Sequence, residues 1–316
     1  MAEFIKIASN PVPDGGEVFN FAARDGAILR GAYFPAPDAR GAIVVVTGWS
    51  EFIEKYFEVV TRLQERGLNV AMMDWRGQGL SDRDSGPASK WTGYFSTIVD
   101  DLRLFTEQHV TPRFDGPKFL MTHSMGGLPA LMLLGEGYDE FERAILCAPM
   151  TRLFAQPANS VVNLLANIAG AAGFATTPVT RGEDDSMAFE GNMFTTDPKR
   201  HERFRQLQLA EPKAALNAPT YGWMRAAGVA TGMIRKPGYF DRLKTPIRII
   251  SAGDEKRIDG NDHQTIADQH ALIERVVIPG ALHEIMMERD EIQTLYWQAF
   301  DDFIAPDTAN SSSRPG

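Results

Sequence analysis

This 316-residue chain carries a serine, an acid and a histidine in an order and a setting that could cleave an acyl bond. Ser124 lies in the run THSMGG over residues 122–127, and His283 follows much later in the chain. A serine hydroxyl that a histidine deprotonates can attack a carbonyl carbon, and an acid behind the histidine orients the imidazole. Candidate acids cluster in the segment 251–259. These residue types predict nucleophilic catalysis at Ser124.

The segment around Ser124 has the form of a sharp turn between a strand and a helix. The apolar run 118–121 precedes it, and a helical pattern over 128–134 follows it. Such a turn pushes the serine hydroxyl out at the rim of a sheet, above a helix N-terminus. A solitary surface turn is the alternative, but the preceding strand and the following Gly126 and Gly127 disfavour it.

Short apolar segments alternate with helical segments through much of the chain. Strands that are apolar on both faces and alternate with helices predict an α/β fold with a mainly parallel sheet covered on both sides. An antiparallel hairpin is predicted before them, over 18–34. The predicted parallel strands are 42–47, 69–73, 118–121, 143–147, 246–250 and 275–279, and the helices between them include 55–66 and 95–109.

The alternation breaks at Pro149 and resumes about 95 residues later, which is far longer than an ordinary loop. The intervening residues 150–244 are rich in Ala, Asn, Met, Thr and Pro and contain helical patches. We therefore expect a mostly helical cap inserted into a core formed by 1–149 and 245–305. A separately folding second domain is the alternative, but it would leave the sheet without its last two strands. The polar end, 306–316, is predicted to be disordered.

The candidate catalytic residues all fall just after predicted strands. In sheets of this kind the chemistry lies at the carboxyl ends of the strands. Ser124 and His283 each follow such a strand, and the acidic segment 251–259 follows another. A serine motif alone is only moderately specific. Three elements in the order serine, acid, histidine, each at a strand end, form a much stronger pattern for a hydrolase triad.

Composition narrows the function classes. A formal net charge of −9 argues against nucleic-acid binding and opposes permanent docking on anionic lipid. The single cysteine, Cys147, cannot form an internal disulfide and is expected to be a packed strand residue, which fits a reducing compartment. The first residues have no signal-peptide pattern, and no window has the roughly 18 consecutive apolar residues of a spanning helix. We expect a cytoplasmic protein, with peripheral contact with the inner membrane left open.

Several motifs together resemble the α/β-hydrolase family of bacterial lysophospholipases, monoglyceride lipases and serine-aminopeptidase-like hydrolases. The resemblance covers most of residues 18–304 and includes the serine turn. The other core motifs are Asp74-x-Arg76-Gly77-x-Gly79-x-Ser81 and Gly280-Ala281-x-His283-Glu284. The cap motifs Asn192-x-Phe194-Thr195-x-Asp197-x-x-Arg200 and Pro219-Thr220-x-Gly222-Trp223 look like the bacterial lysophospholipase branch.

This resemblance implies a role for each triad residue. Ser124 is the implied nucleophile and His283 the implied base. The family pattern Ala-Gly-x-Asp/Glu-x-x-Val/Ile places Glu255 in the slot of the acid. Asp254 is only one residue away and stays open as the alternative, with Asp259 a weaker candidate.

The resemblance also implies an oxyanion hole, with one backbone N–H from Met125 and one from Trp49 in the loop after the first parallel strand. Two positions depart from the family pattern. Thr47 replaces the usual histidine, and Thr122 replaces the usual glycine two residues before the serine. Neither change removes a reacting group, but both could change the rate or the shape of the acyl pocket.

Neighbouring polar residues receive structural interpretations. His123, beside the nucleophile, is expected to be structural, and Asp74 and Arg76 are expected to brace their turn as a pair. Glu284 and Glu288 are expected to favour the N-terminus of the last helix. The remaining histidines show no metal-ligand spacing and are expected to be solvated; they are His109, His201, His263 and His270.

One cap segment, 160–174, is strongly apolar. Val161, Leu164, Leu165 and Ile168 share one face of a predicted helix. Such a helix must be buried, line an apolar channel or touch lipid. A channel for an acyl chain suits the family best, and other cap residues could line it: Met187, Met193, Trp223, Met224 and Met233.

The predicted function is hydrolysis of a carboxylic ester in a single-chain lipid, such as a lysophospholipid or a monoacylglycerol. Neither a metal nor an organic cofactor is implied, the partner is a small acyl ester, and transient membrane contact through the cap stays open. A second hypothesis keeps the triad but cleaves small esters or peptides, with the acidic run 183–185 as the candidate anchor for a substrate amine. A third, a non-catalytic binding protein, is disfavoured because Ser124 and His283 are both present. Dehalogenase-type relatives would need an aspartate at position 124.

Overall fold

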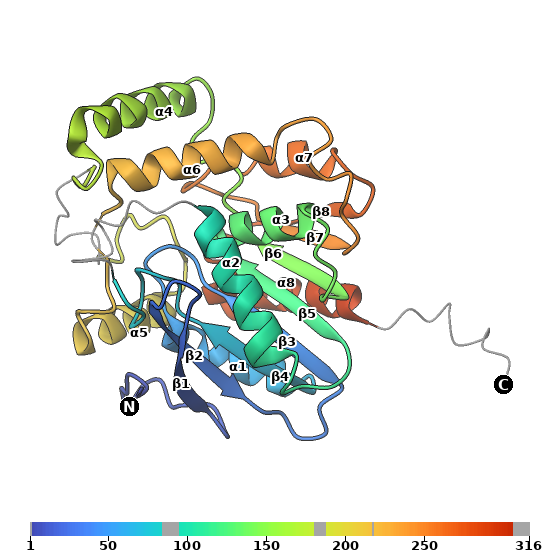
Figure 1. Cartoon of the computed structure of the whole chain (residues 1–316). Helices are drawn as coiled ribbons and strands as arrows, with labels where there is room; N and C mark the ends of the chain where they lie inside the picture. Colours follow the sequence, from blue (N-terminus) through green and yellow to red (C-terminus); the bar gives the residue numbers. More distant parts are fainter. Residues whose placement is uncertain (1, 84–94, 180–187, 217, 306–316) are drawn as a thin grey trace, which may run out of the picture.

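A computed structural model describes residues 2–83, 95–179, 188–216 and 218–305, and it shows one sheet flanked by helices (Figure 1). The eight strands run in the order β1-β2-β4-β3-β5-β6-β7-β8 across the sheet. Their bounds are β1 Glu17–Ala22, β2 Ile28–Phe34, β3 Gly41–Val46, β4 Leu68–Met73, β5 Lys118–His123, β6 Arg143–Cys147, β7 Ile247–Ala252 and β8 Ile273–Ile278.

The sheet is antiparallel at one edge and parallel elsewhere. β1 and β2 form the predicted hairpin, and β2 pairs antiparallel with β4. From β4 to β8 all neighbours are parallel. Parallel strands need crossover connections, and helices supply them here. The predicted mainly parallel sheet with helices on both faces is therefore confirmed.

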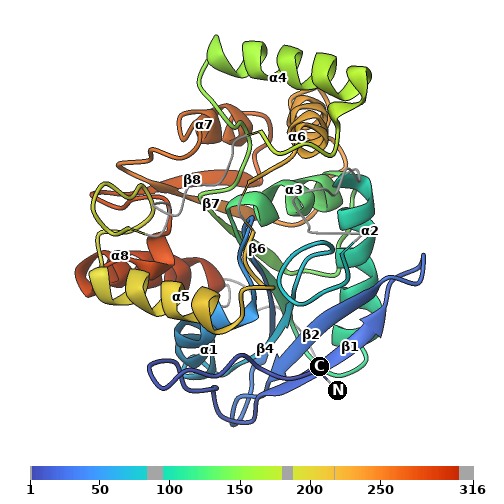
Figure 2. The same ribbon diagram turned by 90° about the vertical axis from the view of Figure 1, so that its left-hand side faces the viewer.

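Strand β3 shows why an entirely apolar strand suits this position. All six of its residues are buried, yet successive side chains point to opposite faces of the sheet. Ala42, Val44 and Val46 pack with α2 and α3, whereas Ile43 and Val45 pack with α1 and α8. Figure 2 shows these two pairs of helices on opposite sides of the sheet. The four helices are α1 Phe57–Gln64, α2 Phe95–Phe105, α3 Gly127–Gly135 and α8 Asp290–Ile304.

In its described part, the long segment between β6 and β7 contributes three α-helices and a π-helical turn, Gly170–Phe174, without separating the two strands. β6 and β7 pair directly, with Leu146 opposite Ile249. The intervening helices are α4 Ala158–Ala169, α5 Pro198–Ala210 and α6 Tyr221–Met233, and α7 Asp262–Ala267 follows β7. Helix α4 packs on α6, and the two lie above the helices that cover the sheet (Figures 1 and 2). Within the described ranges, none of the helices combines the length and the hydropathy needed to span a bilayer.

Candidate active site

Ser124 occupies a strained turn at the end of β5. Its φ angle is +48°, in the left-handed region that a non-glycine residue rarely adopts. Glycines on its C-terminal side let the chain turn this tightly. A Cβ atom on Gly126 would lie 2.6 Å from the Thr47 carbonyl oxygen, and one on Gly127 would lie 2.4 Å from Cβ of Pro149. The turn leaves the Ser124 side chain partly exposed and within reach of a substrate.

The structure brings Ser124, His283 and Glu255 together in hydrogen-bonding distance. The Ser124 Oγ lies 2.8 Å from Nε2 of His283, and Nδ1 of His283 lies 2.8 Å from Oε2 of Glu255. A carboxylate can only accept, so Nδ1 carries the proton and Nε2 presents a lone pair to the serine hydroxyl. This is the tautomer that a general base needs.

Glu255 is held in its charged form. Its side chain is 5% exposed, and burial raises its pKa. Hydrogen bonding and attraction to His283, with hydrogen bonds from the N–H groups of Arg257 and Ile258, outweigh burial, so the pKa lies below its ordinary value. The open alternatives lie elsewhere: the side chain of Asp254 is exposed, and Asp259 pairs with Arg152. Of the three candidate acids, only Glu255 contacts the imidazole.

In the loop after β3, the backbone N–H groups on either side of Trp49 are bound to side chains. The Gly48 N–H donates to Oε2 of Glu51, and the Ser50 N–H donates to Oε1 of Gln78 at 2.6 Å. Between them, the Trp49 N–H has no acceptor in the described part of the chain. Met125 follows the nucleophile at the start of the helical turn. The Trp49 N–H is therefore not taken up by another group, as the predicted oxyanion hole of Trp49 and Met125 requires.

Comparison with known proteins assigns this chain to a family. Residues 37–290 match the family model described as serine aminopeptidase, S33. This chain belongs to that family. Lysophospholipase L2 of Escherichia coli K12 is 26% identical over 307 residues, which cover 93% of this S33-family chain and 89% of the relative. A probable lysophospholipase L2 of Haemophilus influenzae is 24% identical and covers 85% of both chains.

Solved structures show the same fold. A soluble variant of monoglyceride lipase from Saccharomyces cerevisiae superposes with a TM-score of 0.73 at 19% identity, over 91% of this chain and 95% of the other. A carboxyl esterase from Bacillus coagulans gives 0.69 at 18% identity, over 92% and 97%. The predicted α/β-hydrolase fold and the resemblance to lysophospholipases and monoglyceride lipases are therefore confirmed.

Behind the triad of this S33-family chain lies a buried ionic cluster that the sequence did not reveal. Nζ of Lys55 lies 2.7 Å from Oε1 of Glu51 and 2.6 Å from Oε1 of Glu284. Nδ1 of His123 lies 2.9 Å from Glu51, and Nε2 of His123 lies 3.2 Å from the carbonyl oxygen of His283. The hydroxyl of Tyr56 also donates to Glu51. The cluster thus joins the loop after β3, the residue before Ser124 and the loop that carries His283.

Charge pairing sets the protonation of this cluster. Burial alone would raise the pKa of Glu51 and lower the pKa of Lys55 and of His123. Their mutual attraction, with Glu284 beside Lys55, reverses all three directions, so the pKa of Glu51 lies well below its ordinary value and those of Lys55 and His123 lie above theirs. His123 therefore has the structural role expected of it.

Of the predictions for the two acidic residues that follow His283, the one for Glu284 is wrong, whereas the carboxylate of Glu288 does accept from the N–H of Arg289, the N-cap residue of α8, at 3.3 Å. Glu284 does not favour the last helix but pairs with Lys55, because its carboxylate points into the buried cluster. Glu288 is fully buried and accepts from the N–H groups of Leu282 and Thr196, at 2.8 and 2.9 Å. It fastens the loop before α8 to the segment 192–197.

The prediction that Asp74 and Arg76 pair with each other is also wrong. Asp74 accepts from Arg30 at 2.7 Å and from the N–H of Ile53 at 3.0 Å. Arg76 instead donates to Asp101 and to Asp25. Both residues do stabilise their turn, as predicted, but each binds partners on other elements and not the other residue of the pair.

The prediction that four histidines are solvated fails most clearly at His263, while His109, His201 and His270 are half-buried. His263 is 0% exposed and lies 2.8 Å from both the Ser251 hydroxyl and the Pro149 carbonyl oxygen. Because Arg275 already donates to the Ser251 Oγ, that hydroxyl donates to Nδ1 and Nε2–H donates to the carbonyl. Burial lowers its pKa to about 4. Among the described residues, no group of histidine, cysteine and acidic side chains is arranged to hold a metal ion.

Thr47 and Thr122, which depart from the family pattern, are both fully buried. Neither hydroxyl has a hydrogen-bond partner in the described part of the chain. The Thr47 carbonyl oxygen accepts from the indole N–H of Trp75 at 2.7 Å, so the loop is held here by its backbone.

The apolar helix between β6 and β7 lies on the surface. In α4, Val161, Leu164, Leu165 and Ile168 are each 54–60% exposed, whereas Ala166 on the opposite face is 2% exposed. Burial of the apolar face, one of the three expected outcomes, is therefore wrong. Of the proposed channel residues, Trp223 and Met224 are buried, Met193 is 37% exposed, Met233 is half-buried and Met187 falls outside the described residues. Trp223 lies near the loop after β3, with its ring centroid 6.1 Å from that of Trp49.

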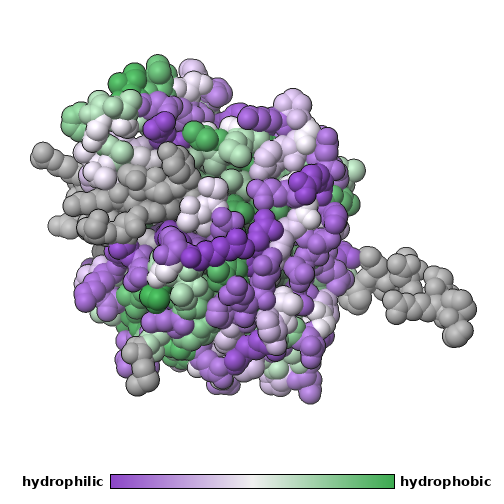
Figure 3. All heavy atoms as spheres, viewed as in Figure 1, coloured by the Kyte–Doolittle hydropathy of each residue, from purple (hydrophilic) through white to green (hydrophobic). Residues whose placement is uncertain are grey.

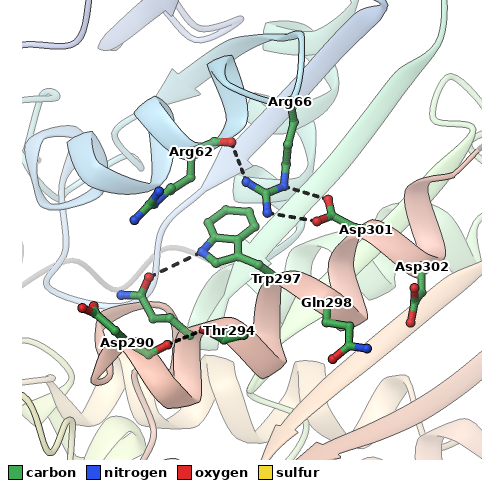
Figure 4. A pocket seen from close by; sticks show the side chains of 9 residues that line it. Arg62, Arg66, Asp290, Thr294, Trp297, Gln298, Asp301 and Asp302 are labelled. Atoms are coloured by element: carbon green, nitrogen blue, oxygen red, sulfur yellow. Dashed lines mark hydrogen bonds and ion pairs between the residues drawn. The ribbon is translucent and has the colours of Figure 1, made fainter.

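A surface pocket of about 560 Å³ between α1 and α8 contains none of the triad residues (Figure 4). In it the guanidinium of Arg66 lies 4.3 Å from the ring centroid of Trp297 and pairs with Asp301. These contacts tie α1 to α8 across the face of the sheet that is opposite to α2 and α3. We assign this pocket to packing.

Proposed function

We propose that this protein hydrolyses carboxylic esters of single-chain acyl lipids, such as lysophospholipids or monoacylglycerols, through an acyl-enzyme on Ser124. The lysophospholipase L2 relatives and the S33-family match indicate a carboxylic-ester hydrolase. The observation that carries the mechanism is the pair of 2.8 Å contacts linking Ser124, His283 and Glu255.

In the proposed reaction, Nε2 of His283 takes the proton as the Ser124 Oγ attacks the ester carbonyl carbon. Glu255 stabilises the imidazolium that results. The N–H groups of Trp49 and Met125 stabilise the oxyanion, and a single such donor is worth about 2.7–4 kcal/mol in a protease. The intermediate then collapses, the leaving alcohol takes the proton from His283, and the acyl group stays on the serine. Water, activated by the same histidine, releases the fatty acid and regenerates the serine.

The cap supplies the argument for a lipid substrate. Residues 153–179 contain no charged side chain, and the exposed apolar face of α4 lies within them. Figure 3 shows hydrophobic surface at the top of the molecule, where α4 lies. We propose that residues 150–244 act as a cap on a core of 1–149 and 245–305, and that α4 contacts the surface of a lipid aggregate from which the substrate enters. The net charge of −9 favours a zwitterionic or neutral surface over an anionic one.

A panel of acyl esters with four variants tests the reaction and the assignment of the acid. Ser124→Ala and His283→Ala should lower kcat/KM by at least about 10⁴-fold, as in other serine hydrolases. Glu255→Ala should lower it by about 10²- to 10⁴-fold, while Asp254→Ala should stay within about twofold of wild type. A large loss with Asp254→Ala and a small one with Glu255→Ala would reverse the assignment of the acid.

The family description favours one second candidate, cleavage of an aminoacyl amide or a small ester by the same triad. The acidic run 183–185 expected to anchor a substrate amine falls outside the described residues. Aminoacyl amides compared with acyl esters of several chain lengths separate the two functions, and preference for the amides would end the lipid proposal. Labelling by a fluorophosphonate that Ser124→Ala abolishes would exclude a non-catalytic binding protein.

A further inference from the structure

A second pocket, of about 520 Å³, lies against the loop that carries the triad acid. One wall is the segment 252–261, which contains Glu255. The opposite walls come from the chain just after β6, at 153–155, from Met193 and from the side chains of Arg275 and Val277 on β8. The pocket is therefore shared by the core and the cap segment.

The anionic groups that line this pocket are already paired. Glu255 accepts from His283 at 2.8 Å and from two backbone N–H groups of its own loop. Asp259 pairs with Arg152 at 3.3 Å. Neither carboxylate therefore forms an ion pair with a cation of the pocket lining.

The three cations of the lining, Lys256, Arg257 and Arg275, have no carboxylate within ion-pair distance among the residues that the structure describes. Arg275 donates only to neutral oxygens, the Ser251 hydroxyl at 2.9 Å and the Gly260 carbonyl at 3.3 Å. The Arg257 guanidinium lies 5.8 Å from the ring centroid of Phe194, a contact that leaves its charge uncompensated.

Arg257 shows the electrostatic consequence. Partial withdrawal from water lowers its pKa below the ordinary value, and attraction to Glu255 offsets this only in part. A positive group in this position is stabilised by any anion that enters the pocket. The excess of positive charge is notable in a chain whose net charge is −9.

The rim of the same pocket is apolar. Phe154 is 38% exposed, Met193 is 37% exposed and Val277 is 44% exposed, and all three line the pocket. Large side chains left this exposed in one place are available to an apolar ligand. Cationic and apolar groups therefore meet in one cavity, which is the complement of a molecule that has an anionic head and an alkyl chain.

We propose that this pocket binds the anionic head of a single-chain lipid, with Lys256 and Arg257 contacting the anion, Arg275 adding positive charge, and Phe154, Met193 and Val277 contacting the adjoining alkyl chain. The inference rests on the proposed function, which provides two sources of such an amphiphile. One is the phosphate-bearing head of a lysophospholipid substrate, and the other is the carboxylate of the released fatty acid. The shared chemistry is an oxyanion attached to an alkyl chain.

Calorimetric titration with ligands that contain no ester tests the pocket independently of catalysis. Decyl phosphate, below its micellar concentration, should bind the wild-type protein at least tenfold more tightly than neutral 1-decylglycerol ether and than inorganic phosphate. The double variant Lys256→Gln/Arg257→Gln should weaken decyl phosphate binding at least tenfold and leave binding of the neutral ether within twofold. Lys256→Arg/Arg257→Lys should restore it, because both charges are kept.

The control is Lys199→Gln/Lys213→Gln, which removes two exposed cations outside the pocket and should leave the affinity for decyl phosphate within twofold of wild type.

Decanoate run beside decyl phosphate identifies the source of the ligand. Tighter binding of decyl phosphate assigns the pocket to a substrate head, and tighter binding of decanoate assigns it to the product. Equal affinity for decyl phosphate and the neutral ether, or an unchanged affinity in Lys256→Gln/Arg257→Gln, would overturn the proposal. So would equal affinity for inorganic phosphate, since the alkyl chain would then contribute nothing. A loss of esterase activity in Ser124→Ala bears only on the proposed function, so the two can fail separately.

Discussion

Glu51 accepts hydrogen bonds from four groups on three elements of the active site: the N–H of Gly48, the ammonium of Lys55, the ring of His123 and the hydroxyl of Tyr56. Because its pKa lies well below the ordinary value, it stays charged, and a neutral substitute would leave Lys55 short of one counter-charge in a buried site.

We expect Glu51→Gln to lower kcat about tenfold or more with little change in KM, because the loop after β3 and His283 would lose their common support while the substrate surface is unchanged. Steady-state kinetics on an acyl ester measure both constants. Glu58→Gln is the matched control, since Glu58 is another glutamate with two cationic partners, Arg200 and Arg203 on α5, but it contacts none of Ser124, His283 and Glu255. Similar kcat losses in both variants would show that Glu51 acts only through general stability.

His263 predicts a pH dependence of stability. Its folded pKa is lowered from 6.5 to about 4, so the unfolded chain takes up a proton that the folded chain refuses. The stabilisation is complete above pH 6.5 and is lost as the pH falls toward 4, by up to about 3 kcal/mol. In His263→Gln, which keeps a donor and an acceptor, the free energy of unfolding should fall less over this range. Denaturant titrations at pH 4.5 and 7 measure it, and equal losses in both proteins would contradict the prediction.

At the scale of elements, the turn between β5 and α3 depends on close backbone approach. A methyl group on Gly126 or Gly127 would meet the Thr47 carbonyl or Pro149 at 2.6 Å or less. We expect Gly126→Ala and Gly127→Ala each to lower the free energy of unfolding by about 1–3 kcal/mol and to reduce activity, since Ser124 would move. Gly232→Ala on α6 is the control, because nothing lies within 4 Å of its Cβ position, and it should be neutral or stabilising. Thermal unfolding distinguishes these outcomes.

Helix α4 presents its apolar face outward, so substitutions there should affect lipid contact rather than folding. Leu164→Asn/Leu165→Asn should leave the unfolding temperature within about 2 °C of wild type, because both side chains are already exposed. If α4 contacts lipid, wild type should gain activity when an acyl substrate passes from monomers to micelles, and this variant should lose most of that gain. Leu209→Asn on α5 and Leu295→Asn on α8 remove leucines of similar exposure elsewhere and serve as controls. Loss of the increase in the controls as well would argue against a specific role for α4.

At the scale of the whole molecule, the net charge of −9 predicts which lipid surfaces the protein prefers to bind. Binding to vesicles of zwitterionic lipid should exceed binding to vesicles containing anionic lipid, and added salt should narrow the difference by screening. Vesicle sedimentation at two salt concentrations measures this. Stronger binding to anionic vesicles at low salt would mean that a local basic surface, and not the net charge, governs docking.

Much of this architecture could be predicted from local pattern. Hydrophobic periodicity and turn residues predict the apolar strands, the hairpin and the position of the candidate catalytic residues just after strands. These signals are local, because each depends on only a few neighbouring residues. The assignments that failed share another cause. Glu284 and His263 each take partners far away in the chain, and nothing near them in the sequence indicates those partners.

The amino-acid sequence by itself determined the sheet, the sharp turn at Ser124 and the candidates for the base and the acid, since hydrophobic alternation and glycine positions specify them locally. Only the tertiary structure decided that Glu255, and not Asp254, contacts His283, because adjacent residues on a loop point in different directions once the loop is packed. The tertiary structure also decided that the buried ionic cluster around Lys55 supports the site and that the apolar face of α4 is exposed to solvent. Contacts between distant segments determine these outcomes, and the local sequence pattern does not predict such contacts.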